Sequence, residues 1–130
     1  MEDIKYITIS EKNDGMLQQL RNLNLLGHKH DLWRAAALIG LKIDPNFELD
    51  AKEKKLIRRS SDNKAQNIIC NQIDESGDLA FLINEYAPDK DGHTYRKMQA
   101  LIHLGLTTIR KEYIEDGVIN WDAIQSLFKK

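Results

Sequence analysis

The chain begins with a short segment in which apolar and polar side chains alternate. Within residues 5–10 the apolar positions are Ile7 and Ile9, and their neighbours are Tyr6, Thr8 and Ser10. This period of two is typical of a half-buried β-strand. The remaining pattern offers no second strand of similar quality, and an isolated strand leaves backbone groups unpaired. We therefore expect the strand, centred on Tyr6, Ile7, Thr8 and Ile9, to pair with its copy in a second subunit.

Apolar side chains then recur at helical spacing in the first half of the chain. The spacing predicts a helix over residues 13–26, ended by Gly27, and a second over residues 31–40, where three alanines favour close packing. A short, highly charged helix is expected over residues 50–59, and residues 60–63 have the composition of a linker.

Helical spacing continues in the second half. It covers residues 65–73 and 79–86, and the segment 88–92 carries the strongest loop signal in the chain. The longest apolar stripe predicts a central helix over residues 94–116, ended by Gly117.

A last helix is expected over residues 121–128. Asn120 is its candidate N-cap, and the side chains expected to be buried are those of Trp121, Ile124 and Phe128. Together these patterns predict a mainly α fold, with one short N-terminal strand followed by five to six helices.

Composition narrows this picture. With 130 residues, of which 42% are hydrophobic, the chain is long enough for one core, and we expect a single helical domain over residues 1–130. The net charge of −1 arises from 19 basic and 20 acidic residues, so global charge gives no argument for a nucleic-acid partner. Neither a secretory signal nor an apolar run of about 20 residues is evident, which predicts a cytoplasmic protein without membrane contact.

Few residues form a pattern typical of catalysis or metal binding. The single cysteine, Cys70, lies among isoleucines and is expected to be a core residue. The cluster of His28, His30 and Asp31 lacks further zinc ligands, and the acidic cluster around Asp74 lacks a phosphate-binding loop. We therefore expect no catalytic residues, no metal and no cofactor, although a site assembled from distant residues stays open.

The densest basic segment lies in the charged helix. It comprises Lys52, Lys54, Lys55, Arg58 and Arg59, followed by Lys64. Such a cluster is able to contact DNA phosphates, with an affinity that falls as salt rises. Nearby acidic residues partly neutralise it, so an ordinary solvated helix face is the alternative.

The order of elements at the N-terminus resembles that of ribbon-helix-helix proteins. A strand at residues 6–10 is followed by one helix and then by an alanine-rich helix. In that family two strands pair across a dimer and their outward side chains enter the major groove. The resemblance implies that Ile7 and Ile9 face the core, and that the DNA-facing side chains are those of Tyr6, Thr8 and Ser10.

A second resemblance concerns residues 31–42. The segment contains Leu32, three consecutive alanines that begin at Ala35, and then Gly40 and Lys42. It resembles small proteins of bacterial Dnd systems, which phosphorothioate DNA or restrict unmodified DNA. The resemblance implies an accessory DNA-binding or complex-assembly protein that partners the components of a modification or restriction complex. The alternative is a protein-interaction adaptor without DNA contact, and an enzyme comes third.

Overall fold

The computed structural model describes residues 3–22, 29–60 and 67–129, which form seven helices and four short strands. The first half contains β1 (Tyr6–Thr8), α1 (Glu11–Asn22), α2 (Lys29–Ile43) and α3 (Ala51–Ser60). The second half contains β2 (Asn67–Ile69), α4 (Cys70–Ile73), α5 (Asp78–Tyr86), α6 (Thr94–Glu112), β3 (Ile114–Glu115), β4 (Val118–Ile119) and α7 (Trp121–Ser126). The mainly α fold is thus confirmed.

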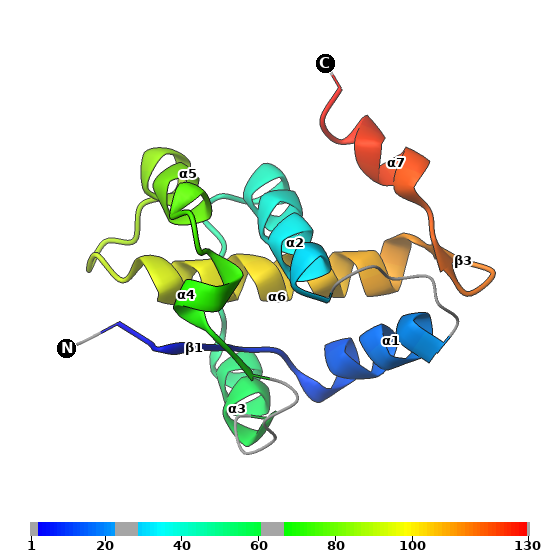
Figure 1. Ribbon diagram of the computed structural model, residues 1–130, viewed down its shortest axis with the longest axis horizontal. Coiled ribbons are helices and arrows are strands. Elements are labelled where there is room, and N and C mark those ends of the chain that lie inside the picture. Colours follow the sequence, from blue (N-terminus) through cyan, green and yellow to red (C-terminus); the bar gives the residue numbers. More distant parts are fainter. Residues whose placement is uncertain (1–2, 23–28, 61–66, 130) are drawn as a thin grey trace.

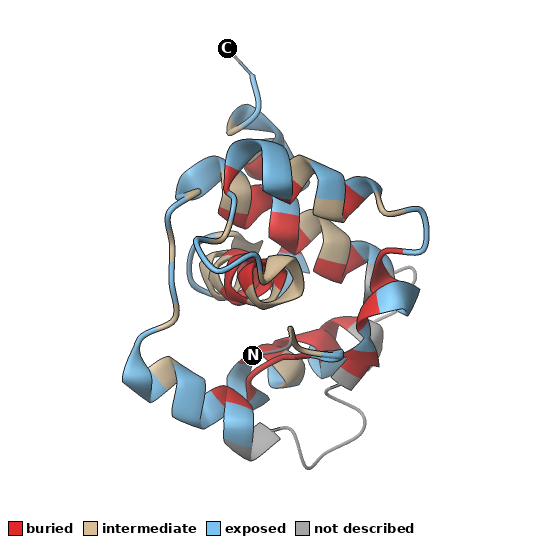
Figure 2. Cartoon of the chain, turned by 90° about the vertical axis from the view of Figure 1, so that its left-hand side faces the viewer, coloured by how far each residue is buried: buried red, intermediate tan, exposed pale blue. Residues whose placement is uncertain are grey.

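Helix α6 lies at the centre of the molecule. It crosses the middle of Figure 1, with α2 and α5 above it and β1, α1 and α3 below it. Figure 2 looks along α6 and shows its buried and half-buried residues enclosed by the neighbouring elements. Within the stripe predicted from the sequence, Met98, Ile102 and Ile109 are fully buried, and Tyr113 at its end is half-buried. The expected central helix is confirmed, although it ends at Glu112.

The most extensive helix–helix contact joins α2 to α6. Two glycines allow it: a Cβ added to Gly40 would overlap the backbone of Leu101, and one added to Gly105 would overlap the backbone of Ala36. Each glycine therefore lies against the backbone of the opposite helix. Because no side chain separates them there, the two helix axes approach closely.

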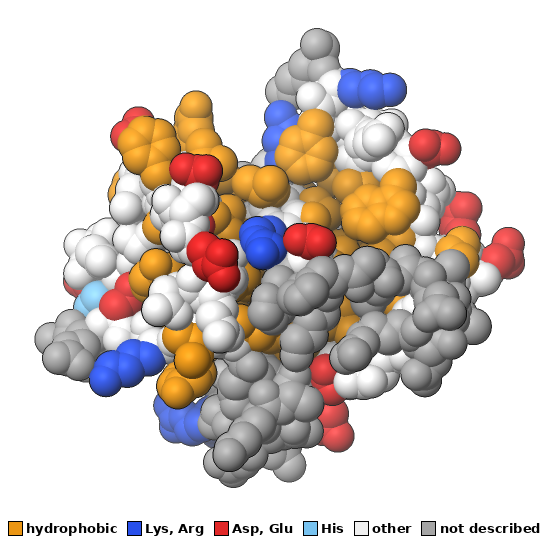
Figure 3. Space-filling model, viewed as in Figure 1, with side chains coloured by type: hydrophobic (Ala, Val, Ile, Leu, Met, Phe, Trp, Pro, Cys, Tyr) orange, Lys and Arg blue, Asp and Glu red, His pale blue; other side chains and the backbone are white. Residues whose placement is uncertain are grey.

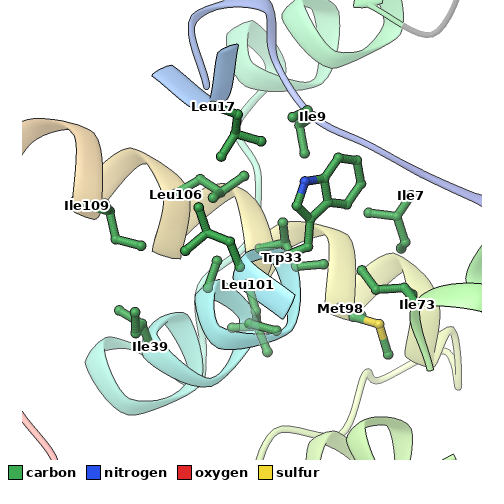
Figure 4. Packing of buried hydrophobic residues seen from close by; sticks show 14 of the residues in the cluster. Ile7, Ile9, Leu17, Trp33, Ile39, Ile73, Met98, Leu101, Leu106 and Ile109 are labelled. Carbon is green, nitrogen blue, oxygen red and sulfur yellow. The ribbon is translucent and has the colours of Figure 1, made fainter. Parts of the chain in front are cut away.

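Trp33 on α2 fills the space beside this crossing. Its side chain is fully buried and points towards β1, where Figure 4 shows it between Ile7 and Ile9 on one side and α6 on the other. The expectation that Ile7 and Ile9 face the core is confirmed.

The expectation that β1 finds no partner within its own chain is wrong. Strand β1 pairs with β2 in antiparallel register, with Ile7 opposite Ile68. On α6, the Gln99 side chain accepts a hydrogen bond from the Thr8 backbone N–H at 2.9 Å. The reason to expect β1 to pair with a second subunit is therefore removed, and self-association stays a prediction. Thr8 and Ser10, expected to face outwards, are both buried, whereas Tyr6 is exposed.

Strand β2 lies within a segment expected to be helical. The apolar spacing of residues 65–73 is compatible with a helix, but residues 67–69 pair with β1, and only Cys70–Ile73 form a helical turn. Short apolar runs do not distinguish a strand from a helix, and the tertiary partner decided the outcome.

The C-terminal segment also departs from expectation. Gly117 does not end α6; it follows Asp116 in the turn between β3 and β4, and both residues have positive φ, of 80° and 53°. This backbone conformation is typical of a type I′ hairpin. The Asn120 side chain caps α7 as expected, by accepting a hydrogen bond from the Ala123 N–H. Of the apolar residues expected to be buried, Ile124 is buried, but Trp121 and Phe128 are 44% and 48% exposed.

Two buried or half-buried carboxylates stabilise helix N-termini. Asp74, which the sequence placed in an acidic cluster, accepts hydrogen bonds from the backbone N–H groups of Leu79 and Ala80 at the start of α5. Asp3 accepts hydrogen bonds from Tyr95 and Arg96 at the start of α6. Among the described residues, no helix combines the length and apolar character needed to cross a bilayer.

Candidate nucleic-acid interface

Helix α3 carries the basic segment, and local capping defines where it begins. The Asp50 carboxylate accepts a hydrogen bond from the Glu53 N–H at 2.7 Å, and the Glu53 carboxylate accepts one from the Asp50 N–H at 3.0 Å. This reciprocal pair is a capping box, which satisfies two of the backbone donors that every helix start leaves unpaired. Asp50 and Glu53 are therefore structural residues, although they lie beside the cations.

The same Glu53 side chain attaches α3 to the centre of the molecule. Its second oxygen, Oε2, lies 3.1 Å from Nε2 of His103 on α6. One turn further along α3, Ile57 is buried. Residues four positions apart share a helix face, so α3 contacts the core through a narrow stripe that contains Glu53 and Ile57.

His103 is a buried imidazole whose charge state follows from its surroundings. Burial lowers its pKa, Arg110 lowers it further, and the adjacent Glu53 carboxylate only partly opposes this effect. The ring is therefore neutral at neutral pH and donates its Nε2 proton to Glu53. Nδ1 has no hydrogen-bond partner among the described residues. In this tautomer it carries a lone pair in place of a proton, so no N–H donor is left unpaired.

The remaining faces of α3 present cations to solvent. Lys52, Lys54, Lys55 and Arg58 are all exposed, as the sequence predicted for this segment. The side chain of Arg59 and the whole of Lys64 lie outside the described residues. Five of the six predicted basic residues thus lie on α3, and the four whose side chains are described are exposed.

A cleft of about 590 Å³ opens on one side of α3, between this helix, the start of α1 and the second half of α6. It contains four cations from three helices: Lys12, Lys52, Arg110 and Lys111. Three carboxylates, those of Glu11, Asp50 and Glu53, share the lining with His103 and Thr107. Sequence analysis identified only Lys52 in this group, because the other cations are far from α3 in the chain.

A smaller hollow of about 300 Å³ lies on the opposite side of α3. Lys54 borders it, two residues after Lys52, and a helix turns by about 200° over two residues. Lys90, Arg96 and the buried Lys97 also line this hollow. The Lys97 ammonium donates a hydrogen bond to the Phe47 carbonyl at 2.9 Å, which makes it a structural cation. Basic side chains therefore flank α3 on both sides.

Other chemically interesting residues have structural roles. Cys70 is buried, and desolvation raises its pKa to about 11, so it is a neutral thiol and the expected core residue. Asp89, Asp91 and His93 cluster in the loop before α6, where backbone N–H donors, chiefly that of His93, lower the Asp89 pKa. The Asp89 side chain thereby organises this loop.

Comparison with known proteins adds no family to these observations, since no protein-family model, curated protein or solved structure matches this chain.

Proposed function

We propose that this protein is a non-catalytic accessory protein that binds the phosphate backbone of duplex DNA through α3 and its flanking surface. One observation carries the proposal: the face of α3 that contains Glu53 and Ile57 is directed towards the core, and the helix exposes four cations. Basic side chains that serve only solubility need no such concentration on one helix. The resemblance of residues 31–42 to small proteins of Dnd systems suggests the setting, a bacterial DNA-modification or defence complex.

The electrostatics of the chain favour weak, salt-dependent binding. The net charge is −1, so attraction to DNA depends on this local surface and not on the field of the whole molecule. Lysine and arginine contacts to phosphates release counterions, which makes the affinity fall as salt rises. Such contacts position a protein on the duplex without reading its sequence.

The test replaces Lys54, Lys55 and Arg58 with Gln and measures duplex affinity over a salt series by fluorescence anisotropy. If each side chain contacts one phosphate, the plot of log affinity against log salt should become shallower by about 2.7. The matched control replaces Lys5, Lys42 and Lys129, which are exposed and lie outside α3, with Gln. Both variants lose three positive charges, so only a local interface separates them.

Equal loss of affinity in the two triple variants would point to nonspecific charge. Unchanged binding in the α3 variant, or no binding by the parent protein at low salt, would overturn the DNA proposal. Circular dichroism should show the parent helix content in both variants, because the substituted side chains are exposed.

A second candidate function, a protein-interaction adaptor, is favoured by a different surface. Aromatic side chains are exposed on α5, where Phe81 is 64% and Tyr86 70% accessible, and near the C-terminus at Trp121 and Phe128. Figure 3 shows apolar side chains gathering over α5 and α7 on the upper part of this face. Exposed aromatic groups of this size are typical of protein interfaces. If this surface binds a partner protein, a complex with the product of a neighbouring gene should persist after nuclease treatment. The double substitution Phe81→Ser with Trp121→Ser should abolish that complex.

A further inference from the structure

We propose that the cleft between α1, α3 and α6 binds a single phosphate group. The Arg110 guanidinium contacts the phosphate oxygens, and Lys52 and Lys111 flank the phosphate. This inference deepens the proposed function and rests on it, because the group we assign is a phosphodiester of the duplex backbone. The α3 surface would then contact several phosphates along a strand, and the cleft would hold one.

Arg110 is held in place by a buried polar network. Its Nε donates a hydrogen bond to Oδ1 of Asn13 at 3.1 Å, and the Asn13 amide nitrogen donates to the Thr107 hydroxyl at 3.2 Å. Asn13 is fully buried in the first turn of α1, where its backbone N–H donates to the Ser10 hydroxyl. Asn13 occupies only Nε, and no other described residue bonds to the two terminal nitrogens of Arg110. A guanidinium oriented in this way is suited to bidentate contact with phosphate oxygens.

The other cations of the cleft are not engaged elsewhere. Within the described part of the chain, the ammonium groups of Lys12, Lys52 and Lys111 make no hydrogen bond or ion pair. Two of the three neighbouring carboxylates are already engaged, since Asp50 and Glu53 bond to each other's backbone and Glu53 also bonds to His103. These acids therefore do not neutralise the cations through direct contact.

The charge balance of the lining favours one phosphodiester. Four cations stand against three carboxylates, and His103 is neutral, which leaves a surplus of one positive charge. A phosphodiester carries a single negative charge, whereas a phosphate monoester carries about −1.5 to −2 at neutral pH. A second phosphate in the same cleft would exceed this surplus and lie against the carboxylates.

The first experiment follows the Arg110 Nε–H resonance by NMR while inorganic phosphate or a short duplex is added. A change in chemical shift that appears with duplex and is smaller or absent with inorganic phosphate supports a backbone phosphodiester. A larger shift with inorganic phosphate than with duplex would assign the cleft to free phosphate and overturn the backbone assignment. No shift with either probe overturns the inference altogether.

The second experiment compares variants. Arg110→Lys keeps the charge but loses the fork, and should weaken duplex binding about tenfold with little change in salt slope. Lys52→Gln with Lys111→Gln should weaken duplex binding but leave the salt slope nearly unchanged, because Arg110 still neutralises the one phosphate; if each lysine contacts a phosphate of its own, the slope should become shallower by about 1.8. A slope change near 1.8, or an affinity equal to that of the parent, overturns the single-phosphate assignment. This double variant alters exposed residues only, so it decides the question if Arg110→Lys fails to fold.

The two proposals fail separately. If the triple α3 variant loses binding but Arg110→Lys binds as the parent does, the cleft inference is wrong and the DNA proposal stands. If the parent binds no duplex, the DNA proposal and the backbone assignment both fail.

Discussion

Helices α2 and α3 are both joined to α6, but in opposite ways. Helix α2 meets α6 backbone to backbone at Gly40 and Gly105 and buries Trp33 beside the contact. Helix α3 is joined to α6 by a polar pair, Glu53 and His103, and exposes four of its cations to solvent. The first contact supplies stability, because it removes apolar surface from water. The second holds a charged helix in place at the surface, which is what a binding element requires.

The largest effect should come from charging the α6 core. Ile102 is fully buried, so Ile102→Asp places a carboxylate without a partner among apolar side chains. The cost of several kcal/mol is comparable with the whole stability of a small domain, about 5–15 kcal/mol, and the variant should be unfolded. Lys55→Asp on α3 makes a similar change at an exposed position and should alter stability by only about 0.5 kcal/mol. Cooperative thermal melting of both variants near the parent midpoint would refute this contrast.

A smaller loss is expected from crowding the α2–α6 crossing. In Gly105→Ala the added methyl group overlaps the Ala36 backbone, and the helices must separate, at a cost of about 1–3 kcal/mol. Gly15→Ala is the matched control, because Gly15 lies in α1 with no atom near the added Cβ. Alanine is the better helix former, so this control should gain about 0.5–1 kcal/mol. Urea denaturation measures both, and a neutral Gly105→Ala would show that the crossing is loosely packed.

The smallest effect concerns the attachment of α3 and depends on pH. Burial, assisted by Arg110, lowers the pKa of His103 below its unfolded value of about 6.5, so the unfolded chain takes up the proton first as pH falls. The contribution of neutral His103 to stability is therefore complete above about pH 6.5 and is lost as pH falls through the folded pKa. The difference in urea midpoint between the parent and His103→Gln should shrink over this range. A difference that grows on acidification would mean that the Glu53 carboxylate holds the ring protonated.

Local rules recovered much of the fold from sequence. The apolar stripe of α6, the alternation of Ile7 and Ile9, and the Asn120 cap all depend on residues a few positions apart, and each was predictable. The capping box of Asp50 and Glu53 is equally local, and its spacing of three residues was a signal that the prediction of α3 did not use. Exposure of the α3 cations followed from the same kind of reasoning.

What the tertiary structure alone decided involves partners far apart in the chain. Strand β2 is a strand because β1 lies beside it, and Asp3 caps a helix that begins 91 residues later at Thr94. The cleft joins Asn13 to Arg110, which are 97 positions apart, so no local pattern marks Arg110 as an oriented cation. Sequence periodicity specifies which face of an element is apolar, because that depends on helix and strand geometry alone. Which elements meet is decided by packing the whole chain, and the cleft exists only once α1, α3 and α6 have met.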